Sequence, residues 1–96
     1  MSYIKVKVKY LAPYIKNLIG IDEEFIEIEK GSTIKDVILK LVEVHGKHVL
    51  TLLLKEGEKD LREGILIALN DIVVQSINHR VSDGDIISIL ITVNGG

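Results

Sequence analysis

The chain has 96 residues, of which 47% are hydrophobic, so it can form one domain with a substantial core and has no room for a second. Its formal net charge of −2 argues against a nucleic-acid-binding protein, which usually carries a strong basic excess. The lack of cysteine excludes disulfides and cysteine nucleophiles. The sequence has neither a signal-peptide core nor an apolar run of roughly 18 residues. We therefore expect a cytoplasmic protein without a membrane segment.

The N-terminal third predicts two strands with a short helical turn between them. Residues 3–10 alternate between lysines and apolar side chains, which is the period of a half-buried strand. A second strand is expected at Phe25–Glu29, and pairing of the two would place the lysines across from Glu27 and Glu29. Apolar residues in the intervening segment favour a helical turn, with Pro13 near its start.

The middle of the chain contains the clearest helix. Thr33 and Asp36 match a capping box, and the apolar residues from Ile34 onward recur on one helical face. Gly46 is suited to the position that follows the last helical residue. A second, short helix is expected within Lys47–Lys55, although an apolar run of this length also fits a strand.

The C-terminal half predicts three further strands. Ile65–Leu69 and Ile72–Val74 are joined by a turn at Asn70-Asp71, and Asp85–Val93 forms the last strand after a glycine turn. One amphipathic helix can cover only one face of so small a mixed sheet. We therefore expect an α+β domain of two layers, in which the other face of the sheet stays exposed.

The sequence ends in Asn94-Gly95-Gly96, directly after the predicted last strand. Because glycine has no side chain, a Gly-Gly segment can pass through a narrow channel into the active site of another protein. The segment from Val93 to Gly96 can reach about 13 Å when extended. We therefore predict that the carboxylate of Gly96 is the reactive group and that Asn94 is a polar spacer in the tail.

Several segments in this order carry a resemblance to a known family. They are Val6–Ala12, Gly31–Ile34, Ala68–Asp71, Asp83–Ile86 and Gly95-Gly96. The chain resembles the ubiquitin-like β-grasp fold, a mixed sheet of about five strands with one main helix on one face, and within it the MoaD/ThiS family of sulfur carriers. The resemblance covers nearly the whole chain and implies a single domain over residues 1–96, with a flexible tail from about residue 93.

The resemblance also implies a reaction cycle. An E1-like adenylyltransferase would use ATP to adenylate the carboxylate of Gly96, and a sulfur donor would then displace AMP to leave a thiocarboxylate. The chain would bind no cofactor itself and would serve as the small subunit of molybdopterin synthase. A large subunit would supply the catalytic side chains. No phosphate-binding glycine loop, nucleophile motif or metal-ligand cluster occurs, so we do not expect a stand-alone enzyme.

Two features leave the subfamily open. Molybdopterin-type carriers usually have prolines where this chain has Ile91-Thr92, and the chain is longer than the thiamine-type carriers. The alternatives are a thiamine- or tRNA-type sulfur carrier, or a ubiquitin-like modifier whose Gly96 is joined to lysines of target proteins. A simple binding module with an incidental Gly-Gly end is a further alternative.

Alternation along the strands also predicts a partner-binding surface. It places Leu11, Val73 and Leu90 on outward faces, and an exposed apolar patch often marks an interface. The resemblance implies that these positions contact the large partner subunit. The histidines at positions 45, 48 and 79 lack further ligands nearby, so we interpret them as helix-terminal or solvated residues and predict no metal site.

Overall fold

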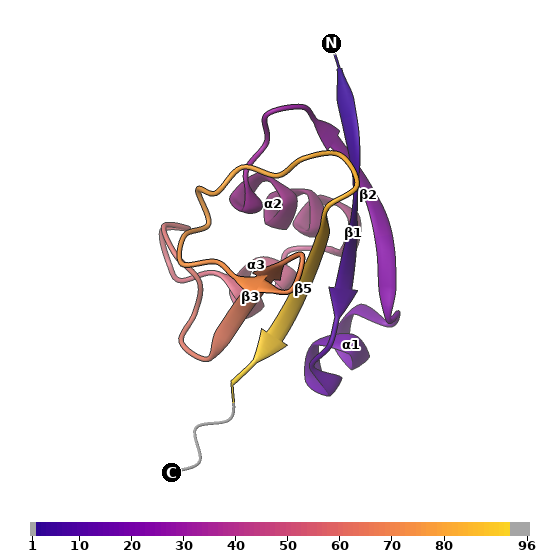
Figure 1. Cartoon of the computed structure of the whole chain (residues 1–96). Coiled ribbons are helices and arrows are strands. Elements are labelled where there is room, and N and C mark those ends of the chain that lie inside the picture. Colours follow the sequence, from indigo (N-terminus) through magenta and orange to yellow (C-terminus); the bar gives the residue numbers. More distant parts are fainter. Residues whose placement is uncertain (1, 93–96) are drawn as a thin grey trace.

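The computed structural model describes residues 2–92, and it consists of a five-stranded sheet with helices packed against it (Figure 1). In chain order the elements are β1 (Tyr3–Tyr10), α1 (Pro13–Ile19), β2 (Glu23–Glu29), α2 (Ile34–His45), α3 (His48–Leu53), β3 (Ile65–Leu69), β4 (Ile72–Val73) and β5 (Ile86–Ile91). The predicted α+β class and the predicted order of elements are therefore confirmed.

The sheet is mixed, as predicted, with the strand order β2-β1-β5-β3-β4. The two strands at its centre, β1 and β5, run parallel, while all other neighbours run antiparallel. Parallel strands end at the same side of a sheet. The chain therefore leaves β5 at the end of the molecule where β1 runs into α1 (Figure 1).

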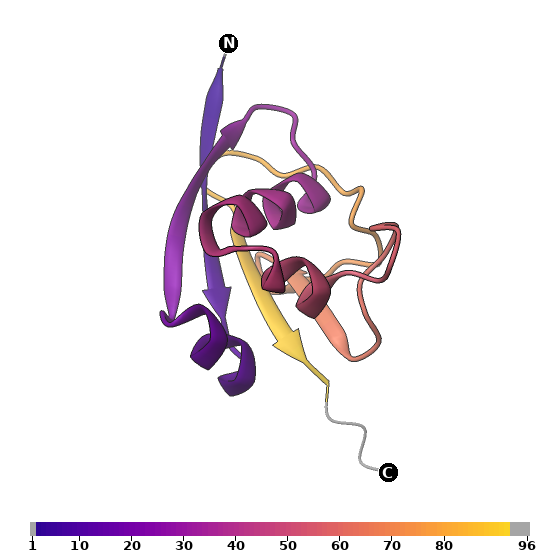
Figure 2. The same ribbon diagram turned by 180° about the vertical axis from the view of Figure 1, so that it is seen from behind.

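The core lies between one face of the sheet and the helices α2 and α3, which cover this face when the molecule is seen from behind (Figure 2). The central strands contribute fully buried isoleucines and valines, and α2 contributes its predicted apolar face. Burying one such side chain contributes about 1.5–3 kcal/mol. The largest fully buried side chains of β1, β3, β5 and α2 are Val6, Val8, Ile67, Ile87, Ile89, Ile34, Val37, Ile38 and Leu41.

The ends of α2 have the local interactions that the sequence predicts. The hydroxyl of Thr33 accepts a hydrogen bond from the amide of Asp36 at 3.3 Å, and the carboxylate of Asp36 accepts one from the amide of Thr33 at 2.8 Å. This reciprocal pair is the capping box. The helix stops at Gly46, whose φ of +112° is strained for a residue with a side chain.

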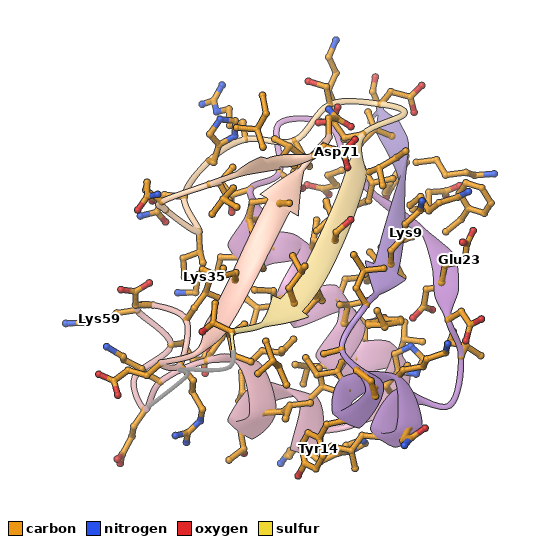
Figure 3. The ribbon with its side chains drawn as sticks, turned by 60° about the horizontal axis from the view of Figure 1, so that its bottom comes forward. Lys9, Tyr14, Glu23, Lys35, Lys59 and Asp71 are labelled. Carbon is orange, nitrogen blue, oxygen red and sulfur yellow. The ribbon has the colours of Figure 1, made fainter. Side chains whose placement is uncertain are left out.

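The register of β1 and β2 corrects one expectation. β2 begins at Glu23, two residues earlier than predicted. Lys5 lies opposite Glu27 as expected, but Lys7 lies opposite Phe25, and its ammonium group instead forms an ion pair with Glu23 at 3.0 Å. Figure 3 shows Glu23 on the strand beside Lys9, its cross-strand neighbour. The sequence pattern alone did not define this register, because alternation is the same after a shift of two residues.

The C-terminal strands are slightly shorter than predicted. β4 ends at Val73 and β5 ends at Ile91, and the described chain continues to Thr92. Within residues 2–92 the structure has no helix with the length and apolar character required to span a bilayer.

Candidate functional site

The chain is fastened to the sheet directly before the predicted reactive tail. The amide of Thr92 donates to the carbonyl oxygen of Gly64 at 2.7 Å, and its hydroxyl donates to the same oxygen at 3.3 Å. These bonds hold the residue after β5 against the residue before β3. The predicted tail residues, Val93, Asn94, Gly95 and Gly96, lie outside the described residues, so their roles stay predictions.

The beginning of β5 is also held in place. The carboxylate of Asp85 accepts hydrogen bonds from the side-chain amide of Asn70 at 2.9 Å and from the backbone amide of Ser82 at 2.7 Å. Asp83 accepts one from the amide of Lys5 at 2.8 Å. The two aspartates of this glycine turn therefore hold the backbone in position at the start of β5.

An apolar patch lies on the helix-free face where the chain leaves the sheet. The amide of Leu11 donates to the carbonyl of Ile89 at 3.0 Å, which continues the pairing of β1 with β5 and places Leu11 beside Leu90. Leu90 in turn lies opposite Leu66 of β3. We call Leu11, Leu66 and Leu90 the tail-end patch. Leu11 is 54% exposed and the other two are half-buried, so the patch offers apolar surface to a partner.

A hollow of about 390 Å³ adjoins the tail-end patch. Its lining is almost entirely apolar and comes from the end of β5 and the start of α1. The lining residues are Leu11, Ala12, Pro13, Tyr14, Leu90 and Ile91. Figure 3 shows Tyr14 on α1 at this end of the molecule.

Val73 shares the helix-free face but lies apart from the tail-end patch. It pairs with Ala68, which pairs with Ser88, so two strands separate it from the end of β1. It is 45% exposed. Of the three residues predicted to bind a partner, the structure thus brings Leu11 and Leu90 together and places Val73 further along the sheet. Their binding role stays a prediction.

Sequence reasoning missed Leu66 as a member of the patch. The alternation of a strand places Leu66 on the same face as Ala68, but all five residues of Ile65–Leu69 are apolar, so the sequence does not indicate which face is outward. The position of Leu66 opposite Leu90 also depends on the pairing of β3 with β5, which joins residues 24 positions apart. That pairing has no local signal in the sequence.

A polar cluster joins three elements near the same end of the sheet. Glu24 of β2 accepts a hydrogen bond from the hydroxyl of Tyr10, and its Oε2 lies 2.5 Å from Nε2 of His45 at the end of α2. Burial, and then the hydrogen bond and the charge of Glu24, raise the pKa of Tyr10 far above its ordinary value. His45 is helix-terminal as predicted, but it is half-buried and partnered.

The histidines provide no metal centre in the described structure. Nδ1 of His79 lies 2.8 Å from the carbonyl oxygen of Arg80, within its own loop. Across residues 2–92, no three side chains of histidine, cysteine, aspartate or glutamate are grouped so that they could hold a metal ion.

Comparison with known proteins identifies the family. The model of the ThiS family matches residues 8–96, which is nearly the whole chain. The chain belongs to the ThiS family. A protein from Pyrococcus furiosus described as molybdopterin converting factor, subunit 1, is 33% identical to this ThiS-family chain. The match covers 94% of this chain and 99% of that one, with a TM-score of 0.75.

Two further solved structures share the fold. The small archaeal modifier protein 1 of Methanosarcina acetivorans matches over 100% of both chains with a TM-score of 0.80 and 24% identity. A chain in the BexX/CysO complex of Amycolatopsis orientalis is 29% identical, with coverage of 95% of this chain and 99% of that one and a TM-score of 0.72. Among curated protein sequences no match was found. The ubiquitin-like β-grasp fold and membership of the ubiquitin-like sulfur-carrier family are thus confirmed.

Proposed function

We propose that this ThiS-family chain carries sulfur as a thiocarboxylate on Gly96 and delivers it as the small subunit of molybdopterin synthase. The observation that carries the proposal is the family match, which extends through Gly95 to Gly96. The identity of 33% with the molybdopterin converting factor subunit of Pyrococcus furiosus favours the molybdopterin pathway over other sulfur acceptors.

The chemistry requires an activating enzyme, because a carboxylate is a poor electrophile. In the proposed cycle the carboxylate of Gly96 attacks the α-phosphorus of ATP, and pyrophosphate leaves. A sulfide-level sulfur atom from a donor then attacks the carbonyl carbon of this mixed anhydride, and AMP leaves with the bonding electrons. The thiocarboxylate that remains is anionic at neutral pH and nucleophilic, as a low-pKa thiolate is. An E1-like adenylyltransferase would provide the ATP site.

The tail-end patch supports docking of the globular body to such partners. Leu11 and Leu90 lie beside the point at which the described chain ends, and Thr92 is held to Gly64 by two hydrogen bonds. The four residues beyond Thr92 can extend about 13 Å. A partner that covers the patch could therefore receive Gly96 in a buried active site while the body of the carrier stays outside.

Reconstitution with purified components tests the molybdopterin assignment. The carrier would be mixed with an E1-like enzyme and the large subunit of molybdopterin synthase from the same source, with ATP, a sulfide donor and the sulfur-free pterin precursor. We expect dithiolene formation that is limited by the amount of carrier and is lost when Gly96 is deleted. Isopeptide conjugates to target lysines, with no dithiolene formed by an otherwise active large subunit, would instead identify a protein modifier.

A further inference from the structure

β2 presents one row of unpaired backbone groups. It lies at the edge of the sheet and pairs only with β1. The amide of Tyr10 donates to the carbonyl of Asp22 at 2.8 Å, so antiparallel alternation directs the backbone groups of even-numbered β2 residues toward β1. Those of Glu23, Phe25 and Glu27 point away from the sheet and have no backbone partner in the described chain. Such an edge can accept a further strand.

The side chains along this free edge are predominantly acidic. Glu23, Glu27 and Glu29 are exposed on the helix-free side of β2. Glu23 is paired with Lys7, whereas Glu27 and Glu29 have no ion-pair partner among residues 2–92. Lys5 of β1 lies opposite Glu27 but forms no ion pair with it. An added strand would therefore place its own side chains beside two carboxylates that lack an ion-pair partner in the described chain, which favours basic residues at these positions.

The other side of the edge offers a shallow hollow of about 300 Å³ between β2 and α2. Ile28 and Leu39 provide its apolar surface, and Leu39 is 36% exposed. Asp36, Lys40 and Glu43 supply charged groups to the lining, and Lys40 forms an ion pair with Glu43 at 3.5 Å. An added strand has side chains on alternate sides, so those that face α2 would meet the apolar surface of Ile28 and Leu39 within a rim of mixed charge.

Phe25 determines which type of side chain an added strand would place at one further position on the helix-free side. It is 64% exposed, and the ammonium groups of Lys5 and Lys7 lie 5.8 and 5.2 Å from its ring centroid. A basic residue placed beside Phe25 would meet these two cations. An apolar residue is therefore favoured there.

We propose that the β2 edge binds an extended basic peptide by strand addition. The peptide places basic side chains beside Glu27 and Glu29 and an apolar one beside Phe25. Its alternate apolar side chains lie against Leu39. A second copy of this chain does not fit the edge, because each central antiparallel register of β2 with itself brings at least two glutamates together, for example Glu23 with Glu29.

The proposed peptide site is separate from the tail-end patch. β1 lies between β2 and β5, and β2 runs antiparallel to β1. The Glu29 end of β2 is therefore at the opposite end of the sheet from the end of β5 (Figure 1). The part of the peptide site at Glu27 and Glu29 therefore lies away from the tail-end patch.

An NMR titration of the full chain tests the proposal. The probe is a capped peptide of sequence Lys-Val-Lys-Val-Val-Val-Lys, which, running antiparallel to β2, places lysines beside Glu29, Glu27 and Glu23 and a valine beside Phe25. A peptide with glutamate in place of each lysine is the comparison. We expect the largest shift changes and slowed hydrogen exchange at the amides of Glu23, Phe25 and Glu27, with affinity for the lysine peptide that falls as salt is added. Equal binding of both peptides, no binding of the lysine peptide at millimolar concentration, or shifts confined to other strands would overturn the proposal.

Charge reversal provides a second, matched test. The variant with Glu27→Lys and Glu29→Lys replaces two attractive cross-strand pairs with repulsive ones, so we expect about tenfold weaker binding of the lysine peptide. The control variant carries Glu56→Lys and Glu63→Lys, which are exposed residues outside β2 and α2 with the same change in net charge. An equal loss of affinity in both variants would show that the effect comes from the change in net charge, and it would contradict a specific site at the β2 edge. If the β2 variant does not fold, the proposal is tested by the changes in amide chemical shift that the lysine peptide causes in the unmodified chain.

Discussion

The side-chain amide of Asn70 donates a 2.9 Å hydrogen bond to Oδ1 of Asp85, and its Oδ1 accepts one of 2.9 Å from the amide of Ile86. These bonds connect the turn between β3 and β4 to the first residue of β5. Asn70 adopts a φ of +50°, a conformation that asparagine tolerates better than most residues. Because β5 leads directly to Thr92, this connection helps to define the strand from which the tail begins.

Removing the Asn70 side chain should therefore destabilise the domain. Asn70→Gly keeps a residue suited to positive φ but deletes both side-chain hydrogen bonds, one of which satisfies a backbone amide. We expect the free energy of unfolding to fall by about 1–2 kcal/mol, as measured by urea denaturation.

Asp71→Gly is the matched control for this prediction. Asp71 is the next residue of the same turn, has a φ of +69° and makes no side-chain hydrogen bond to the described residues. Glycine is favoured at such a φ, so we expect this variant to be as stable as the original chain or slightly more stable. An equal loss of stability in both variants would show that the turn, and not the Asn70–Asp85 connection, is responsible.

Truncation of the tail-end patch should weaken partner binding without affecting the fold. Leu11→Ala removes an exposed side chain beside Leu90, and we expect about tenfold weaker binding to the large subunit by calorimetry, as for an interface hot spot. Val44→Ala is the control, because Val44 is 53% exposed but lies on α2. Similar affinity of the Leu11 variant and the original chain would remove the patch from the proposed interface.

The polar cluster predicts a loss of stability at alkaline pH. The pKa of Tyr10 is higher in the folded chain than in the unfolded one, because burial and Glu24 disfavour the phenolate. As pH rises through about 10, the unfolded chain releases this proton first. The contribution of protonated Tyr10 is therefore complete below that pH and decreases progressively above it.

Two tyrosine variants separate this contribution from the general alkaline effect. In Tyr10→Phe we expect the free energy of unfolding to decrease less steeply above pH 10 than in the original chain. Tyr14→Phe should keep the original slope, because Tyr14 is 62% exposed. The same slope in all three proteins, from urea denaturation at several pH values, would show that Tyr10 titrates without a folding contribution.

Local signals predicted most of the fold. The capping box at Thr33 and the period of α2 predict that helix, the alternation in residues 3–10 predicts β1, and the short apolar run at residues 65–69 predicts β3. The start of β2 was missed because Glu24 occupies a core-facing position where alternation calls for an apolar residue. Its partners, Tyr10 and His45, are 14 and 21 residues away, so only the tertiary structure explains why a carboxylate is tolerated there.

The candidate site was predictable to a similar extent. The outward positions of Leu11 and Leu90 follow from alternation, but their adjacency, the addition of Leu66 and the separation of Val73 depend on the strand order. The free edge of β2 also follows from that order alone. Strand order reflects contacts between residues distant in sequence, which period and propensity do not encode.

The mass of the intact carrier after incubation with ATP, an E1-like enzyme from the same source and a sulfide donor tests the central claim most directly. We predict a gain equal to the exchange of one oxygen for one sulfur, located in the C-terminal peptide and absent when Gly96 is deleted. An unchanged mass, obtained with an activating enzyme that modifies another carrier under the same conditions, would contradict a sulfur-carrying role for Gly96.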